Sequence, residues 1–194
     1  KTYTSVLDAF SRCGFVRQAE EIVQRMERRG ISPSVQTYTT LVMNYARSRL
    51  PNKAQLAADV LKRMPEPNIC TYNAILNACE HTNDENAKLT ALKIACDTFD
   101  VIRRSPDVQL NHVTYGSFFG ALANLMDSDR NEIVGLVFQK CVLEGHVSNL
   151  VLSKLRKAAS PQLYSRLLAG HREDNLPDEW TCNVRELNAR DATT

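Results

Sequence analysis

The stretch Thr37-Tyr38-Thr39-Thr40-Leu41-Val42-Met43-Asn44-Tyr45 carries the pattern that decides the fold. Apolar side chains follow Tyr38 at offsets of three, four and seven residues, the spacing of one face of an α-helix. The same Thr-Tyr start occurs four times, with the tyrosines separated by 35, 34 and 43 residues. The four ladders are Tyr3, Val6, Leu7, Phe10; Tyr38, Leu41, Val42, Tyr45; Tyr72, Ile75, Leu76, Cys79; and Tyr115, Phe118, Phe119, Leu122. A period of this length predicts an array of structural repeats.

A second ladder with the same offsets follows each first one, so each repeat contains a second amphipathic helix. These ladders are Ala19, Ile22, Val23, Met26; Ala57, Val60, Leu61, Met64; Ala95, Thr98, Phe99, Ile102; and Val134, Val137, Phe138, Cys141. Gly30 and Gly145 lie four residues past the last rung, where glycine suits a left-handed helix C-cap. Each repeat is therefore predicted to be a helical hairpin.

One hairpin cannot bury two apolar stripes alone, whereas stacked hairpins bury them between neighbours. We therefore expect an all-α, right-handed α-solenoid whose Thr-Tyr helices line the concave side. The expected repeats in residues 1–149 are 1–34, 35–68, 69–111 and 112–149. Residues 150–194 are expected to form a degenerate fifth hairpin and a capping helix over 178–189 that includes Trp180. The polar stretch Glu80–Lys88 is interpreted as an insertion that lengthens the link between two helices.

Composition and charge limit the classes of partner. The chain has 194 residues, 43% of them hydrophobic, and its longest apolar run, residues 118–126, is too short to span a membrane. The formal net charge of +2 divides into +5 over residues 1–68, −2 over each of 69–111 and 112–149, and +1 over 150–194. A nucleic acid would thus be held most firmly near the N-terminus. The six cysteines form no C-x-x-C pair, so we expect reduced thiols and neither a metal site nor a cofactor.

The repeats resemble those of the pentatricopeptide repeat family. The resemblance rests on the segments Val35-Gln36-Thr37-Tyr38-Thr39-Thr40-Leu41 and His112-Val113-Thr114-Tyr115, and on the Met-x-x-x-Gly-Ile-x-Pro ending from Met26 to Pro33. It covers residues 1 to about 149. The tetratricopeptide pattern, with Trp, Leu-Gly and Tyr in its first helix, does not occur.

The resemblance implies a single-stranded RNA-binding protein that reads about one base per repeat. In the family, the residue after the tyrosine and the last residue of the repeat contact the base edge. The corresponding pairs are Thr4 with Ser34, Thr39 with Asn68, Asn73 with Asn111, and Gly116 with Asn149. The residue two before the tyrosine sandwiches the base, which gives Lys1, Gln36, Cys70 and Val113.

With RNA running 5′ to 3′ along the repeats, the family's rule implies adenine for Thr39 with Asn68. It implies a pyrimidine, cytosine first, for Asn73 with Asn111, and a purine for Thr4 with Ser34, whereas Gly116 offers no side chain to read a base. The resemblance further implies a monomer in the mitochondrion or plastid that acts in RNA processing, stability or translation. Single-stranded RNA and other RNA-processing proteins are the implied partners, and no membrane is among them.

Two alternatives stay open. A polar side chain in the first turn of a helix can also serve only to cap free backbone N–H groups. The weak total charge and the two acidic middle repeats fit a helical-repeat scaffold for protein–protein interactions instead. No G-x-S-x-G or phosphate-loop motif and no metal-spaced carboxylate cluster occurs, so we do not expect an enzyme, although a catalytic domain outside this segment stays open.

Overall fold

The computed structural model describes residues 2–125 and 130–172, in which ten α-helices and no β-strand occur. The helices are α1 Thr2–Cys13, α2 Val16–Arg28, α3 Val35–Arg47, α4 Lys53–Leu61, α5 Ile69–Glu80, α6 Glu85–Arg104, α7 His112–Leu125, α8 Arg130–Leu143, α9 Asn149–Ala158 and α10 Pro161–Arg172. Over the described residues, the all-α fold expected from the ladders is therefore confirmed. The helix expected over 178–189, with Trp180, lies outside them.

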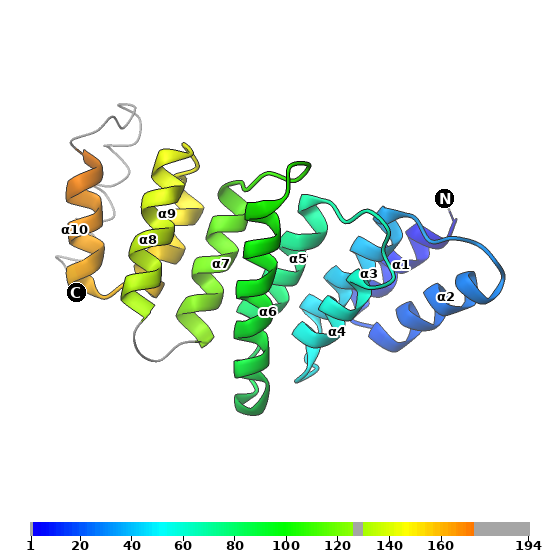
Figure 1. Cartoon of the computed structure of the whole chain (residues 1–194). Coiled ribbons are helices and arrows are strands. Elements are labelled where there is room, and N and C mark those ends of the chain that lie inside the picture. The colour runs from blue at the N-terminus through cyan, green and yellow to red at the C-terminus, as the bar shows by residue number, and fades with distance from the viewer. Residues whose placement is uncertain (1, 126–129, 173–194) are drawn as a thin grey trace.

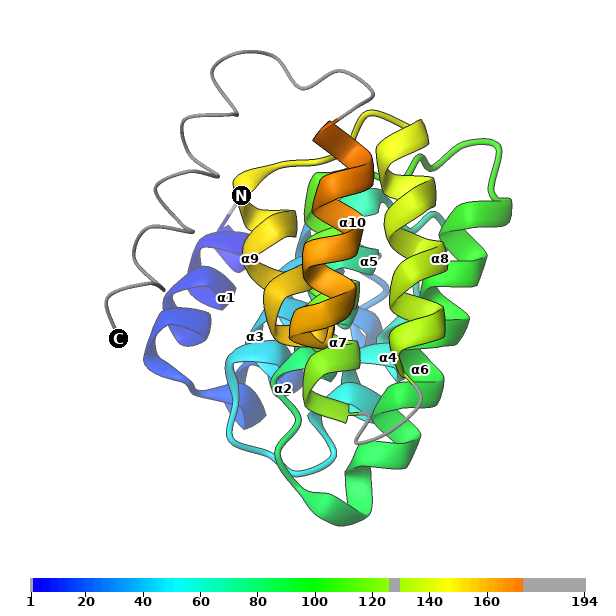
Figure 2. The same ribbon diagram turned by 90° about the vertical axis from the view of Figure 1, so that its left-hand side faces the viewer.

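Successive helices pair into hairpins that stack in a single row (Figure 1). The odd-numbered helices α1, α3, α5, α7 and α9 pack each against the next and form an inner layer. The even-numbered helices form an outer layer, in which α4 packs on α6 and α8 on α10, while α2 and α4, and α6 and α8, lie further apart. Viewed along the row, α1 and α9 lie on one side and α6 and α8 on the other (Figure 2). Because the inner layer is the more closely packed one, the concave side belongs to the Thr-Tyr helices.

The core lies between the two layers and is built from both sets of ladders. Its fully buried members include Leu7, Val23, Leu41, Ile75, Phe119, Phe138 and Cys141. Val6 is an exposed rung of the ladders. The rungs that are only half-buried are Tyr3, Phe10, Ile22, Leu61, Tyr72 and Val137. The 3.6-residue period of the ladders thus identifies the buried face of nearly every helix.

Glycines end the second helices of the first and fourth hairpins as the sequence predicts. Gly30 and Gly145 have φ angles of 68° and 71°, in the left-handed region that favours glycine. Gly30 N–H donates to Glu27 O, and Ile31 N–H donates to Met26 O, each at 2.9 Å. The residues around Gly145 make the same two bonds, so both helices end in a Schellman motif.

The insertion in the third hairpin differs from our expectation of a polar link. The turn comprises only residues 81–84, and α6 begins at Glu85 because the Asp84 side chain accepts a hydrogen bond from Ala87 N–H at 3.1 Å and caps the helix. The extra residues therefore lengthen a helix. With 20 residues, α6 projects beyond the ends of its neighbours (Figure 1).

The tail forms a fifth helical hairpin from α9 and α10. Val151, Leu155 and Ala158 are buried at the rungs expected from the sequence. Ser160 caps α10 by accepting a hydrogen bond from Leu163 N–H at 3.3 Å, and Pro161 is its first residue. The inner layer therefore extends to α9.

Candidate nucleic-acid interface

The exposed side of α3, α5, α7 and α9 forms one continuous surface, which we call the inner face. Three rows of residues cross it, two, five and nine positions past the N-cap of each helix. The rows are Gln36, Cys70, Val113, Leu150; Thr39, Asn73, Gly116, Ser153; and Met43, Asn77, Gly120, Lys157. The second row contains the predicted base-reading residues Thr39 and Asn73, which are half-buried.

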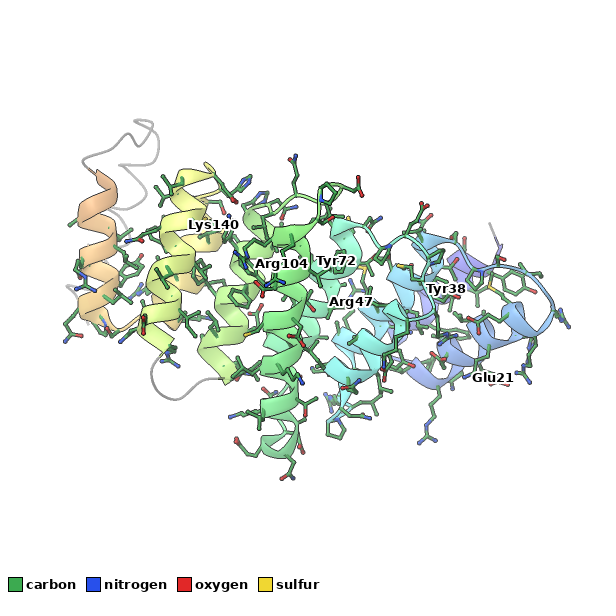
Figure 3. All side chains as sticks on the ribbon, in the orientation of Figure 1. Glu21, Tyr38, Arg47, Tyr72, Arg104 and Lys140 are labelled. Carbon is green, nitrogen blue, oxygen red and sulfur yellow. The ribbon has the colours of Figure 1, made fainter. Side chains whose placement is uncertain are left out.

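Acidic residues are distributed unequally between the inner helices α3, α5, α7 and α9 and the outer layer. The helices α3, α5, α7 and α9 contain one acidic residue, Glu80, against four basic residues, Arg47, Lys154, Arg156 and Lys157. The helices α2, α4, α6 and α8 contain eight acidic and ten basic residues, so their carboxylates lie among cations. Glu21, Arg104 and Lys140 are among the charged side chains of this outer layer (Figure 3). Counting charge along the sequence hides this unequal distribution, because each repeat contributes one helix to each layer.

The structure brings Thr39 and Asn68 together through a third residue, Thr71 of α5. The hydroxyl groups of Thr39 and Thr71 share a hydrogen bond of 2.7 Å. Thr71 Oγ1 also donates to Asn68 Oδ1 at 3.1 Å, and Thr71 N–H donates to the same oxygen at 3.0 Å. Asn68 is thus the N-cap of α5 and a neighbour of Thr39 at the same time.

Asn73 and Asn111 repeat this arrangement one hairpin further along. Thr114 Oγ1 donates to Asn73 Oδ1 at 2.7 Å and lies 3.1 Å from Asn111 Oδ1, which also accepts from Thr114 N–H at 3.0 Å. The two asparagines are in direct contact, since Asn73 Nδ2 donates to Asn111 Oδ1 at 3.4 Å. Sequence reasoning singled out neither Thr71 nor Thr114 for this role, although both belong to the repeated Thr-Tyr pair.

Capping engages only one end of the amide group of Asn68 and of Asn111. The Oδ1 atoms of Asn68 and Asn111 are engaged by the helix ends, whereas their Nδ2 groups make no hydrogen bond with the described residues. An asparagine amide has two donors on nitrogen that are independent of the acceptor oxygen. Capping and base contact are therefore compatible in one residue.

The first repeat is only partly described. Ser34 is exposed and caps α3 by accepting from Thr37 N–H at 3.2 Å. Thr4 is the predicted partner of Ser34, and its side chain lies outside the described part of the structure, as does Lys1. Of the predicted sandwich residues, Gln36 and Cys70 are exposed and Val113 is half-buried.

The fourth repeat has a different inner face. A β-carbon at Gly116 would lie 3.0 Å from Leu150 Cγ, so the Leu150 side chain covers the glycine. Ser148 caps α9 by accepting from Val151 N–H at 3.3 Å, and is thus the residue equivalent to Asn68 and Asn111. The predicted reader Asn149 lies one position later. Without a Thr-Tyr pair in the fifth hairpin, only the capping pattern of Ser148 could have indicated this register.

A half-buried ionic cluster joins the first two hairpins. Arg63 pairs with Glu20 at 2.8 Å and with Glu27 at 2.9 Å, and Tyr38 and Tyr45 donate to Glu27 and Glu20. Burial alone would raise the pKa of the Glu20 carboxyl group, but the hydrogen bonds from Tyr45 and Arg63 outweigh it and lower this pKa. The cluster uses these tyrosines as structural groups, not as base-stacking platforms.

Other chemistry is limited in the described residues. Burial raises the pKa of the Cys79 and Cys141 thiols to about 12, so both stay protonated and unreactive near neutral pH. No group of three potential metal-ligating side chains occurs among residues 2–125 and 130–172. None of the described helices is long and apolar enough to cross a membrane.

Comparisons with known proteins identify the repeats. A family model of the pentatricopeptide repeat domain matches residues 26–81, and one of the PPR repeat family matches residues 1–47. A chloroplastic pentatricopeptide repeat-containing protein of Arabidopsis thaliana is 32% identical over 40% of this chain and 16% of its own length. Two others from the same organism, the second of them mitochondrial, are 28% and 32% identical over 72% and 44% of this chain.

The chain spans 18% and 11% of the lengths of those two relatives. The names of the chloroplastic relative and of the mitochondrial relative agree with the mitochondrial or plastid location that the sequence resemblance implies. The residues matched by the family models include the first three Thr-Tyr helices, α1, α3 and α5. Residues 1–81 of the chain therefore contain repeats of the pentatricopeptide repeat family.

Proposed function

We propose that this chain binds single-stranded RNA along its inner face and reads bases in its second and third repeats. The observation that carries the proposal is the scarcity of acids on α3, α5, α7 and α9, where Glu80 is the only acidic residue against four basic ones. A surface that holds a phosphate backbone needs cations and must avoid uncompensated carboxylates. A protein scaffold has no such need.

The two hydrogen-bonded clusters suggest how bases are distinguished. Thr39 Oγ1 retains acceptor capacity and Asn68 Nδ2 is a donor, which matches the N6 donor and N1 acceptor of adenine. Asn73 and Asn111 present two amide donors, which match the N3 and O2 acceptors of cytosine. Uracil would place its N3–H against a donor. These preferences agree with those that the family's rule implies.

In the fourth repeat, the proposed contact is with the faces of a base and not with its hydrogen-bonding edge. Val113 and Leu150 are the aliphatic members of the first row, and we propose that they sandwich one base between them. Gly116 has no side chain to read that base, and we assign Ser148 to the terminal position that the sequence alone gave to Asn149. For the first repeat we retain Thr4 with Ser34, and Lys1, Gln36 and Cys70 as further sandwich positions.

Pentatricopeptide repeat proteins are in general RNA binders that act in organelles, and we propose a role in RNA processing, stability or translation without catalysis. The chain would act as a monomer, with other RNA-processing proteins as further partners. The test is a titration of labelled RNA with the purified chain at several salt concentrations. We expect binding to single strands, not duplexes, that weakens as salt rises.

Two matched double variants test which surface of the chain binds RNA. Arg47→Gln with Lys157→Gln removes two inner-face cations, and Arg103→Gln with Arg104→Gln removes two outer-layer cations on α6. Only the first pair should weaken binding and reduce its salt dependence. Equal effects would place the RNA elsewhere, and absence of any RNA binding would favour the protein scaffold.

A further inference from the structure

Glu80 and Lys154 form an ion pair across a helix that lies between them. Glu80 is the last residue of α5, Lys154 is in the middle of α9, and α7 packs against both of these helices. The Lys154 ammonium group pairs with Glu80 Oε1, and only 11% of the Glu80 side chain and 22% of the Lys154 side chain are exposed. The pair therefore links the third hairpin to the fifth over the fourth.

Gly120 makes this crossing possible. A β-carbon at that position would collide with the Glu80 carboxylate group, so the carboxylate lies directly against the backbone of α7. Gly120 and Gly116 are four residues apart and so share one face of α7. The ion pair therefore lies on the inner face, about one helical turn, roughly 6 Å, from the Gly116 reading position.

The Glu80 carboxylate is a negative charge on a surface whose other charged side chains are cations. Glu80 is the only acid of the four helices α3, α5, α7 and α9, and it neutralises one of their four cations. A lysine ammonium group binds a carboxylate and a phosphate by the same means, as a point charge with three donors. The Glu80 carboxylate therefore occupies the position that an anionic ligand of Lys154 would take.

We propose that Lys154 is a phosphate-binding side chain that Glu80 holds back, so that an RNA phosphate and the Glu80 carboxylate compete for one ammonium group. This inference rests on the proposed RNA-binding function. Glu80 limits affinity and salt dependence at the fourth repeat, where Gly116 provides no base reader. The strand is consequently held most weakly over α7.

Four variants test the competition through RNA binding between about 50 and 200 mM salt. Glu80→Gln should bind more tightly at low salt and steepen the salt dependence by about 0.7 in the log–log slope, since one further phosphate is contacted. Its advantage over the parent should therefore shrink roughly 2.6-fold across that range. Adding Lys154→Gln to Glu80→Gln should restore the parental slope, whereas Lys154→Gln alone should leave that slope unchanged.

Glu85→Gln is the matched control, because Glu85 pairs with Lys88 in an exposed first turn of the outer helix α6. It removes the same charge and should not change the slope. The inference is overturned if Glu80→Gln binds like the parent, if Glu85→Gln has an equal effect, or if the gain persists without Lys154. It is also overturned if Lys154→Gln alone flattens the slope.

Thermal unfolding establishes that each variant is folded before binding is compared. Should Glu80→Gln not fold, Glu80→Asp replaces it, because its side chain is one methylene too short to cross Gly120. If the parent binds RNA and the variants do not differ from it, this inference alone fails. If neither the parent nor any variant binds RNA, the proposed function fails and this inference fails with it.

Discussion

Thr71 joins two hairpins at the inner face, because its hydroxyl group lies 2.7 Å from that of Thr39 while its own helix is capped by Asn68. The side chain of Thr71 is fully buried beneath the two residues that we propose contact the base. Thr114 has the same place beneath Asn73 and Asn111. The threonine of the Thr-Tyr pair thus contacts both members of each proposed reading pair.

Replacing Thr71 by valine should test whether these contacts orient the proposed reading pair. The variant keeps the shape of the side chain and the backbone cap, but it leaves Thr39 without its partner. We expect a loss of about 1 kcal/mol in the free energy of unfolding and a weaker preference between bases at the second repeat. Chemical denaturation and competition between RNAs that differ at one base measure the two effects. Unchanged base preference would show that Thr71 only packs in the core.

The Arg63 cluster predicts a stability difference that depends on pH. Arg63→Gln should cost about 1 kcal/mol at pH 7, since the cluster is partly exposed. The pKa of Glu20 lies below its ordinary value of 4.5 in the folded chain, so its contribution is present above that value and is lost as the pH falls further. The difference between variant and parent should therefore shrink below about pH 4.5.

Urea denaturation of both proteins at pH 7 and at pH 3.5 checks this. Arg103→Gln serves as the control, because Arg103 forms an exposed pair with Asp100 and should change stability little at either pH. A difference between Arg63→Gln and the parent that is the same at both pH values would contradict an electrostatic role of the cluster.

Two glycine substitutions separate helix propensity from steric conflict. Gly135 lies within α8 with no atom near the place of a β-carbon, so Gly135→Ala should stabilise the chain by about 0.5–1 kcal/mol. Gly120→Ala has the same intrinsic advantage but displaces the Glu80 carboxylate. The midpoint of thermal unfolding should therefore be higher for Gly135→Ala than for the parent, and Gly120→Ala should show no such increase. Equal stabilisation would mean that Glu80 moves aside without cost.

The hairpins could be predicted from the sequence because the apolar ladders recur with a helical period, and the buried ladders of α3 and α5 confirm that reasoning. The helical start of α6 was missed because Asp84 and Glu85 look like turn residues, although Asp is also a preferred N-cap. The ion pair of Glu80 with Lys154 joins residues 74 positions apart. No local pattern reveals such a contact.

The sequence names the residues of the proposed reading pairs but does not give their geometry. Family resemblance singled out Asn68 and Asn111, whereas their dual role depends on which amide atom faces the helix end. The terminal position of the fourth repeat depends on register, because Ser148, one residue before the expected Asn149, is the N-cap equivalent to Asn68 and Asn111. Single-residue register is the least predictable property of a degenerate repeat.

Asn68→Asp tests the central claim, that capped polar pairs on the inner face read RNA bases. Aspartate retains the N-cap, because it is as good a cap as asparagine, but it replaces the Nδ2 donor by a second acceptor. Asn77→Asp is the control, since Asn77 is exposed on the inner face and adds the same charge away from the reading pair. It should weaken binding to all RNAs alike.

The most direct measurement compares the affinities of parent and Asn68→Asp for RNAs that differ only at the base facing the second repeat, at one fixed salt concentration. The parent should prefer adenine, and the variant should prefer guanine, whose ring N–H and exocyclic amine are donors, by about 1 kcal/mol or more, roughly fivefold. If both proteins bind the four RNAs in the same order, and Asn68→Asp only weakens binding as Asn77→Asp does, then Asn68 caps a helix and does not read the base.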